Sequence, residues 1–184
     1  RRLRYGNLVL ESIASDASFH DTMQLIIKFV ADEGAITRCG ILLYDEKDVR
    51  LEVGVHSNLP TELNETFLQP PSGDPVNWIW QAILSGQREV VEDIAAVYSV
   101  EDSKWRSSFV EPIISGDGKV LGGFVTFREQ VGAVSQDELA LVECACRLAR
   151  FAIQRVQSRA ALERSESRYR TFLEQFPAPV FVYD

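Results

Sequence analysis

The stretch from Trp105 to Arg128, WRSSFVEPIISGDGKVLGGFVTFR, constrains the fold more than any other part of the chain. Its two apolar segments, Phe109–Ile114 and Val120–Phe127, are rich in β-branched and aromatic residues, which is typical of strands. Ser115-Gly116-Asp117-Gly118 lies between them and supplies the residues that a tight reversal needs. Because both segments are apolar on both faces, we expect a hairpin of central strands with helices covering one face of the sheet.

Two glycines, Gly122 and Gly123, lie inside the second of these strands. A glycine within a strand marks a bulge or a point where another group approaches the backbone closely. We therefore expect one of these two irregularities in the centre of the sheet.

Composition and charge disfavour several classes of protein. The chain has 184 residues, 46% of them apolar and 25% charged, which is typical of one globular domain with short flanking pieces. Its formal charge of −8 disfavours nucleic acid and anionic membranes as partners, because both attract clustered Lys and Arg. No apolar run approaches the roughly 20 residues that span a bilayer. With no signal peptide and no initiating Met, the chain is expected to be an internal fragment.

The three cysteines do not indicate a disulfide framework. Cys144 and Cys146 are separated by about 200° around the axis of a predicted helix, so they cannot chelate one metal there. Cys39 is expected to be a small core residue. Unpaired thiols favour a reducing, cytoplasmic location.

Hydrophobic periodicity places the elements that precede the hairpin. We expect two helices, two strands, a long irregular segment, a third helix, a third strand and a short polar helix. Their ranges, in that order, are Leu8–Ala17, Ser18–Gly34, Cys39–Tyr44, Val49–His56, Asn58–Asp74, Val76–Leu84, Arg88–Ile94 and Ala95–Lys104. Ser18 is the predicted N-cap of the second helix, Asp74-Pro75 is predicted to open the third, and Gly86 to end it.

The second strand has the clearest alternation in the chain. Its apolar positions alternate with Arg50, Glu52, Gly54 and His56, and they are Val49, Leu51, Val53 and Val55. This period of two predicts one core face and one polar face, with His56 on the polar face.

From Ser135 onward the pattern is that of one long helix. Spacings of three and four residues, as in a coiled-coil seam, connect Leu139, Val142, Cys146, Ala149, Ile153 and Val156. A second apolar stripe beside it contains Leu141, Ala145, Leu148 and Ala152. Two stripes predict two contacts, one with the sheet of the same chain and one with a partner. We therefore expect the first stripe to form a homodimer interface, in either parallel or antiparallel orientation.

With these residues placed, the order of elements is similar to that of the GAF family. The segment WRSSFVEPIISGDGKVLGGFVTFRE resembles the final hairpin of bacterial GAF domains, where an aromatic residue, EPI, a Gly/Asp turn and VLG recur. Phe109, where tryptophan is common, and the small Gly123 depart from that pattern. The resemblance covers residues 8–156. It implies an α+β fold with a central antiparallel sheet, helices on one face, a ligand cavity on the other and a long C-terminal coiled-coil helix.

The tail RSESRYRTFLEQFPAPVFVYD separately resembles the start of a PAS domain. We therefore expect a GAF-like sensory domain over residues 1–156, a helical connector over 157–172 and a truncated PAS domain from 173 to 184. Together these imply a bacterial multidomain sensor whose output, outside this chain, is cyclic-di-GMP turnover (GGDEF or EAL) or a histidine kinase.

The resemblance places the ligand cavity on the sheet face that aromatic side chains would cover. The candidate pocket residues are His56, Trp78, Tyr98, Trp105, Ser107 and Phe109. Such residues line apolar ligand pockets with a few polar groups. The same aromatic residues, together with Trp80, would equally fill that face as ordinary core, and the sequence leaves both alternatives open.

Chromophore and catalytic chemistry are disfavoured. His56 alone is a weak signal for a haem ligand, and no cysteine has a neighbouring His as in bilin-binding GAF domains. The Gly116–Lys119 segment lies between strands rather than before a helix, so it is not a phosphate-binding loop. With two histidines distant in sequence and no nucleophile-elbow pattern, no catalytic triad or catalytic residue is predicted.

These observations favour a non-catalytic sensory module that binds a small ligand and signals through a dimeric helix. One alternative is a degenerate GAF domain that serves only as a dimerising spacer. Another is an enzyme similar to the GAF-fold methionine sulfoxide reductases, whose cysteines lie at the pocket; the cysteine positions here disfavour it.

Overall fold

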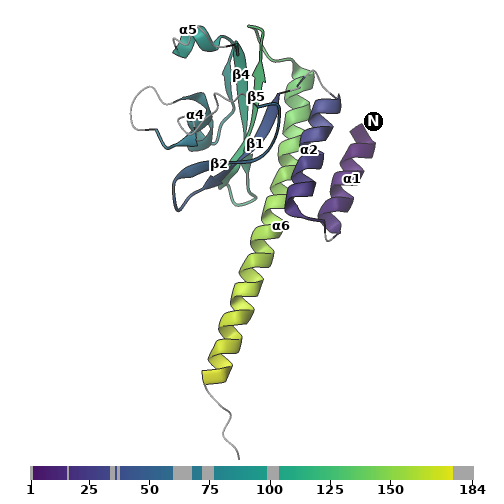
Figure 1. Ribbon diagram of the computed structural model, residues 1–184, viewed down its shortest axis with the longest axis vertical. Helices are drawn as coiled ribbons and strands as arrows, with labels where there is room; N and C mark the ends of the chain where they lie inside the picture. The colour runs from purple at the N-terminus through teal and green to yellow at the C-terminus, as the bar shows by residue number, and fades with distance from the viewer. Residues whose placement is uncertain are drawn as a thin grey trace, which may run out of the picture.

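The structure, a computed structural model, describes residues 2–15, 17–33, 36, 38–59, 68–71, 77–98 and 104–175. Its elements follow the order that the sequence predicts (Figure 1). They are α1 (Arg2–Ala14), α2 (Phe19–Glu33), β1 (Cys39–Asp45), β2 (Arg50–Ser57), α4 (Trp78–Ser85), β3 (Glu89–Val91), α5 (Ile94–Tyr98), β4 (Ser107–Ile114), β5 (Val120–Arg128) and α6 (Gln136–Gln175).

The five strands form one antiparallel sheet in the order β2-β1-β5-β4-β3. The β4–β5 hairpin is therefore central, as its two-sided apolar pattern predicts. At its turn the Ser115 N–H donates to the Lys119 carbonyl at 2.8 Å. Gly118 adopts a φ of 86°, which a side chain would disfavour.

Both irregularities expected at the paired glycines are present at Gly122. The register changes from Ile113 opposite Gly122 to Ile114 opposite Val120, which leaves a bulge in β5. A Cβ on Gly122 would lie 2.0 Å from the Leu42 carbonyl oxygen of β1. Only glycine permits this approach of two central strands.

One face of the sheet is covered by α2 and α6, and α1 lies outside them (Figure 1). This helix-face core joins Phe109, Ile113 and Phe124 of the sheet to the apolar sides of α2 and α6. Helix α1 packs against α2 and α6, and its Val9 is fully buried in the same cluster.

Helix α4 lies on the opposite face of the sheet (Figure 1). A second core lies beneath it. It joins Leu42, Val110, Val125 and Phe127 of the sheet to the apolar residues of α4. The sheet thus has apolar packing on both sides.

The alternation predicted for the second strand changes phase within β2. Ile41 pairs with Val55 but Leu42 pairs with Val53, so a bulge at Gly54 shifts the register by one residue. As a result Leu51 belongs to the α4-face core, whereas Val55 belongs to the helix-face core. Val49 precedes the strand, and Val53 is 39% exposed. The prediction of a single core face was therefore wrong.

The start of α4 also differs from the prediction. Its N-cap is Asn77, whose side chain accepts hydrogen bonds from the N–H groups of Ile79 and Trp80. Gly86 ends the helix in a left-handed conformation, as expected. The predicted opening at Asp74-Pro75 lies outside the described residues. The third strand is shorter than predicted, because α5 begins at Ile94.

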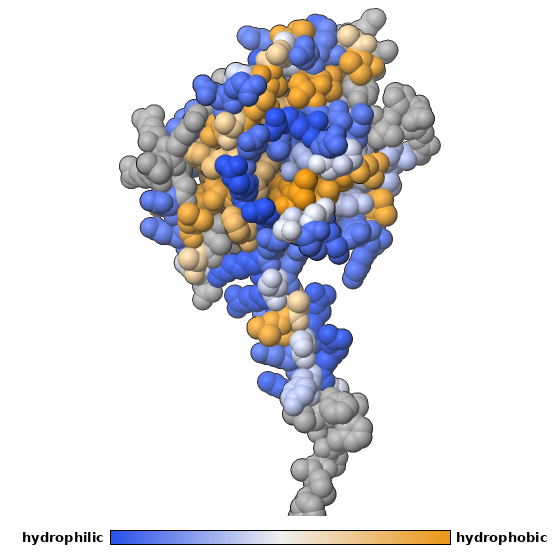
Figure 2. All heavy atoms as spheres, turned by 180° about the vertical axis from the view of Figure 1, so that it is seen from behind, coloured by the Kyte–Doolittle hydropathy of each residue, from blue (hydrophilic) through white to orange (hydrophobic). Residues whose placement is uncertain are grey.

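Helix α6 is the longest element, with 40 residues. Ser135 and Glu138 form a reciprocal capping box at its start, with the Glu138 N–H donating to Ser135 Oγ and the Ser135 N–H donating to Glu138 Oε2. From Val156 to Thr171 every side chain is exposed except that of Ala160, which is half-buried. This part projects from the domain (Figure 1), and its surface is mostly hydrophilic (Figure 2).

The helix passes through the predicted connector and ends at Gln175. The part of the predicted PAS segment that begins at Phe176 lies outside the described residues. In the described part of the chain, no helix combines the length and apolarity needed to cross a membrane.

Candidate functional site

The α4 face of the sheet carries a group of packed aromatic rings. Trp78 and Trp80 come from the first turn of α4, Tyr44 from β1, Phe127 from β5 and Trp105 from the segment before β4. The pairs Tyr44–Trp80, Trp78–Phe127 and Trp105–Phe127 meet edge to face, with centroids 6.0, 6.3 and 6.1 Å apart. Such geometry is favourable for aromatic pairs. The rings form a layer that packs α4 onto the sheet.

Hydroxyl groups connect this layer to the main chain. The Trp78 indole N–H donates to Ser108 Oγ at 2.9 Å, and that hydroxyl donates to the Thr126 carbonyl at 2.6 Å. Ser107, which the sequence analysis selected, donates to the Gln130 carbonyl at 2.6 Å. Both serines are about 1% exposed. Both hydroxyls therefore form hydrogen bonds within the protein that stabilise the fold.

Trp105 is flanked by two cations of the same chain. Arg38 Cζ lies 4.8 Å and Lys104 Nζ 5.5 Å from the ring centroid. Glu129 accepts from both cations, at 2.9 and 3.0 Å. The hydrogen bond from Lys104, aided by the charges of Arg38 and Lys104, lowers the pKa of the Glu129 carboxyl. These contacts hold Trp105 at one end of the sheet.

The structure brings together only part of the predicted pocket set. Trp78 and Trp105 both belong to the α4-face core. Phe109 lies in the helix-face core instead, because its neighbour Val110 points toward α4 and side chains alternate along a strand. Tyr98 is the last residue of α5, and its side chain lies outside the described residues.

His56 is exposed on β2, opposite Gly40 of β1. A Cβ on Gly40 would lie 3.2 Å from His56 Cβ and 2.6 Å from Leu59 Cδ1. Leu59 packs against the α4-face core. His56 is thus on the α4 side of the sheet, at its margin rather than inside the aromatic layer.

The predicted dimer seam is largely covered within the protomer. Val142, Cys146, Ala149 and Ile153 are all at most 7% exposed and belong to the helix-face core, with Leu139 packed against it. Only Val156, at 44%, is exposed. A helix that packs on its own sheet has the same three-and-four spacing as a coiled coil, so the pattern alone did not distinguish the two partners.

A different stripe of α6 is apolar and exposed. Phe151, Leu162 and Tyr169 are 47%, 60% and 66% exposed. Their separations of eleven and seven residues place them on one side of a coiled-coil helix. The sequence analysis missed this stripe because polar residues interrupt it.

The thiols are not arranged as nucleophiles. Cys39 is fully buried in β1, and burial raises the pKa of its thiol to about 12. Burial, together with the nearby Glu111 carboxylate, raises the pKa of the Cys146 thiol. Cys144 is half-buried on α6. Among the described residues, no three His, Cys, Asp or Glu side chains are grouped so as to hold a metal ion.

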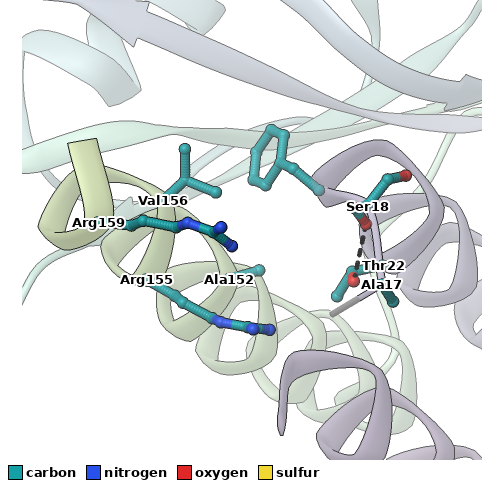
Figure 3. Close-up of a pocket in the computed structure, with 8 residues that line it drawn as sticks. Ala17, Ser18, Thr22, Ala152, Arg155, Val156 and Arg159 are labelled. Carbon is teal, nitrogen blue, oxygen red and sulfur yellow. Dashed lines mark hydrogen bonds between the residues drawn. The ribbon is translucent and has the colours of Figure 1, made fainter. Parts of the chain in front are cut away.

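A cleft of about 230 Å³ lies where α6 leaves the core (Figure 3). Arg155 and Arg159 of α6 line one side, and Thr22 of α2 and the preceding cap residue Ser18 line the other. Ser18 is the predicted N-cap and accepts from the Asp21 N–H at 3.1 Å. Thr22 Oγ1 donates to the Ser18 carbonyl at 3.1 Å, so this wall of the cleft is fixed by the α2 cap.

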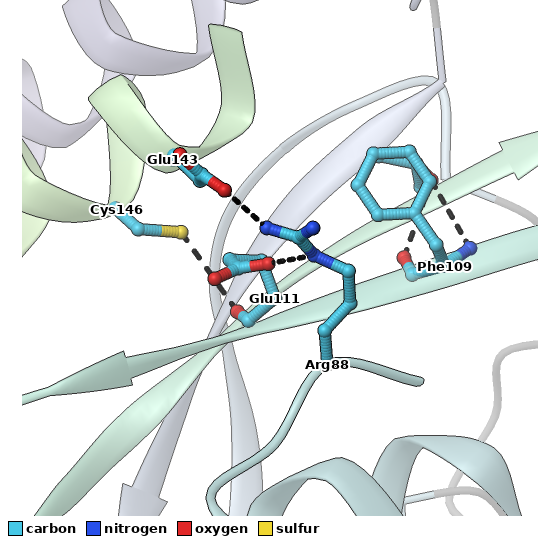
Figure 4. Close-up of polar contacts among 6 residues, drawn as sticks. Arg88, Phe109, Glu111, Glu143 and Cys146 are labelled. Carbon is cyan, nitrogen blue, oxygen red and sulfur yellow. Dashed lines mark hydrogen bonds and ion pairs between the residues drawn. The ribbon is translucent and has the colours of Figure 1, made fainter. Parts of the chain in front are cut away.

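One polar cluster was not predicted from the sequence at all. Arg88, Glu111 and Glu143 come from the α4–β3 connection, β4 and α6, and they form a continuous set of ion pairs (Figure 4). These residues are far apart in the chain. No local pattern in the sequence indicates that they meet.

Comparisons with known proteins agree with this fold. A sequence model described as a GAF domain matches residues 16–154. The methyl sulfide methyltransferase-associated sensor of Methanosarcina acetivorans is 26% identical over 183 residues, or 96% of this chain, but the chain spans only 18% of that protein.

Two solved structures show the same fold. The GAF domain from the Acinetobacter phosphoenolpyruvate-protein phosphotransferase has a TM-score of 0.67 at 19% identity, covering 85% of this chain and 94% of that one. The free methionine-R-sulfoxide reductase from Neisseria meningitidis has a TM-score of 0.64 at 19% identity, covering 85% and 91%.

Proposed function

Because the chain belongs to the GAF domain family, we propose that it is a non-catalytic sensory and regulatory domain that signals through α6. The observation that carries this proposal is the continuity of α6. One uninterrupted helix of 40 residues packs on the sheet with its first half and projects from the domain with its second. A small rotation or shift of the packed half is therefore transmitted to whatever the projecting half contacts.

The proposed input is a small molecule bound at the α4 side of the sheet. Support comes from the concentration of aromatic side chains there and from a sensor among the relatives. A ligand acts on α6 only if it binds one packing of the helices better than another. The aromatic layer, tied to the sheet by the Trp78–Ser108 hydrogen bond, is the part that binding would displace.

Thermal melts against cyclic nucleotides and common metabolites, with an absorption spectrum of the purified protein, test this input. A ligand at a hundred times its Kd stabilises the folded state by about 2.7 kcal/mol, which raises the Tm by several degrees. His56→Ala removes an exposed side chain on the α4 side and should reduce the shift without changing the unliganded Tm. His20→Ala, exposed on α2, is the matched control and should leave the shift unchanged.

We propose that the working state is a homodimer formed through α6. The exposed residues Leu162 and Tyr169 lie on the projecting half of α6, and together with Phe151 at the end of the packed half they support a contact outside the buried seam. The M. acetivorans sensor is far longer than this chain, which supports a place within a multidomain protein. In that setting α6 would lead into a PAS domain and then to a cyclic-di-GMP or histidine kinase output, in the cytoplasm.

A dimerising spacer without a ligand is the second candidate. The observation that favours it is the edge-to-face packing of Trp78, Trp105 and Phe127, which already fills much of the α4 face. A spacer would give no thermal shift with any compound and an unchanged dimer. A shift that His56→Ala reduces would eliminate this candidate.

The reductase among the fold neighbours raises an enzymatic alternative. The chemistry of the thiols argues against it. A thiol attacks as its thiolate, and burial keeps both Cys39 and Cys146 protonated at neutral pH. We expect no thiol-dependent reduction of free methionine-R-sulfoxide, and measurable turnover that Cys144→Ala abolishes would overturn this expectation.

A further inference from the structure

The proposed input and output lie on opposite faces of the sheet, and a residue just after α4 extends its side chain to the α6 face. Arg88 follows Gly86, the residue that ends α4, after a single intervening residue. Its Nε donates to Glu111 Oε2 on β4, and its Nη2 donates to Glu143 Oε1 on α6 at 2.5 Å (Figure 4). The α4–β3 connection, the sheet and α6 are thus joined at one guanidinium.

The register explains how a residue beside α4 reaches α6. Glu89 pairs with Val110, so Arg88 stands opposite Glu111 across the antiparallel β3–β4 ladder. Cross-strand neighbours share a face of the sheet. Glu111 lies between Phe109 and Ile113, which both belong to the helix-face core, and Arg88 therefore points toward α6. The backbone passes from the end of α4 to this position within a few residues.

Helix α6 contacts the same strand position a second time. The Cys146 thiol, one turn after Glu143, lies 3.8 Å from the Glu111 carbonyl oxygen and donates to it (Figure 4). The first half of α6 is therefore held at Glu111 by both a charged and a neutral contact. Only the charged contact includes Arg88, which lies between α4 and β3.

The charges of Arg88, Glu111 and Glu143 make their ion pairs sensitive to the position of Arg88. The three side chains are 28%, 17% and 44% exposed, so the charges are partly removed from water. The hydrogen bond that Arg88 donates to Glu111 raises the pKa of Arg88, which keeps the guanidinium charged at all working pH values. A planar guanidinium can bind two carboxylates through different N–H groups. If Arg88 moves away, Glu111 and Glu143 lose their shared cation and repel each other.

We propose that the Arg88 bridge couples α4 to α6, so that a displacement of α4 loosens the first half of α6. This inference rests on the proposed function, because it specifies how a signal crosses the sheet. Because Arg88 reaches each carboxylate through a single N–H group, a small movement of the α4–β3 connection would break the bridge. A change that loosens α4 should therefore also loosen α6 when the bridge is intact, and should leave α6 unchanged when the bridge is removed.

Hydrogen–deuterium exchange on the 184-residue chain tests the coupling without any ligand. Trp78→Phe removes the indole donor to Ser108 and loosens α4. With the bridge intact, this change should accelerate amide exchange about fivefold in α4 and also in residues 139–153 of α6. In a Glu143→Gln background, the same change should accelerate exchange in α4 alone.

Matched controls separate the bridge from a general loss of charge. Glu163→Gln removes a carboxylate that pairs with Arg159 on the exposed half of α6, and in this background the α6 response to Trp78→Phe should persist. Arg88→Gln should act as Glu143→Gln does. If Arg88→Gln does not fold, Glu143→Gln still decides the question, because its side chain is 44% exposed.

The proposal is overturned if α6 responds equally with and without Glu143, or if α6 does not respond to Trp78→Phe in the parent protein. This outcome is distinct from a failure of the proposed function. A ligand screen without a thermal shift contradicts the sensory input and leaves the measured coupling intact. Coupling that is absent in exchange, combined with a ligand that shifts the Tm, contradicts the bridge alone.

Discussion

At the scale of single residues, Gly122 has the least room for a side chain among the glycines whose surroundings the structure describes. A Cβ there would lie 2.0 Å from the Leu42 carbonyl oxygen, which is backbone and cannot move aside without displacing β1. We expect Gly122→Ala to lower the free energy of unfolding by about 3 kcal/mol or more, measured by urea denaturation. Gly116→Ala, where a Cβ would meet no atom within 4 Å, should change it by less than about 0.5 kcal/mol. Similar losses in the two variants would contradict this account of the β1–β5 contact.

Ionisation of the Cys39 thiol lowers the stability of the protein at alkaline pH. Burial raises the pKa of its thiol from 9.0 to about 12, whereas in the unfolded chain the thiol ionises near its ordinary value. Between these values the folded state binds more protons than the unfolded state, so stability falls as the pH rises. Its contribution is fully present below pH 9 and decreases above it, on the order of 1 kcal/mol per pH unit.

Urea denaturation at pH 8 and pH 10 measures this loss. Cys39→Ala should lose less stability between the two pH values than the parent protein, even if it is less stable at both. Ile41→Val, which removes buried volume from β1 without changing an ionisable group, should retain the parental pH dependence. Equal slopes in all three proteins would show that Cys39 does not cause the loss.

At the scale of elements, the two apolar stripes of α6 have different roles. Ala149 is fully buried against the sheet and α2, whereas Leu162 is 60% exposed. Ala149→Glu places a charge in the helix-face core and should lower the free energy of unfolding by about 3 kcal/mol or more. Leu162→Glu, compared with the parent protein at a concentration where both are monomeric, should change the stability of the domain by less than about 0.5 kcal/mol. Circular dichroism during urea denaturation measures the free energy of unfolding of both variants. A fully stable Ala149→Glu variant would support the original prediction that the seam forms the dimer interface.

The elements themselves were largely predictable, because capping residues, turn residues and periodicity are local signals. Ser18, Gly86 and the hairpin turn all act as the sequence predicted. The sheet face on which each β2 side chain lies was not predictable, since it depends on a bulge opposite Ile41 and Leu42 of β1. The same limit applies to the site. Phe109 faces away from Trp78, and Arg88 meets Glu143 55 residues later, because the sheet register brings these positions together.

At the scale of the whole molecule, the projecting half of α6 needs an explanation. From Val156 to Thr171 its side chains are exposed, apart from the half-buried Ala160. An isolated helix of about this length is marginally stable in water, and one that is polar on most sides gains little from packing. A second copy of the chain would stabilise it by covering Leu162 and Tyr169, the exposed apolar residues on one side.

Sedimentation equilibrium tests this dimer. The parent protein should be a dimer at micromolar concentration, and Leu162→Glu should shift it toward monomer by at least about tenfold in Kd, because two like charges would meet at the contact. Ser167→Glu places the same charge on the opposite side of the helix and should leave the equilibrium unchanged. In a parallel pair Leu162 meets its own copy, so Leu162→Cys should form an interchain disulfide on oxidation, whereas an antiparallel pair would separate the two thiols. A monomeric parent protein would remove the homodimer from the proposed function, and a dimer insensitive to Leu162→Glu would move the interface to another surface.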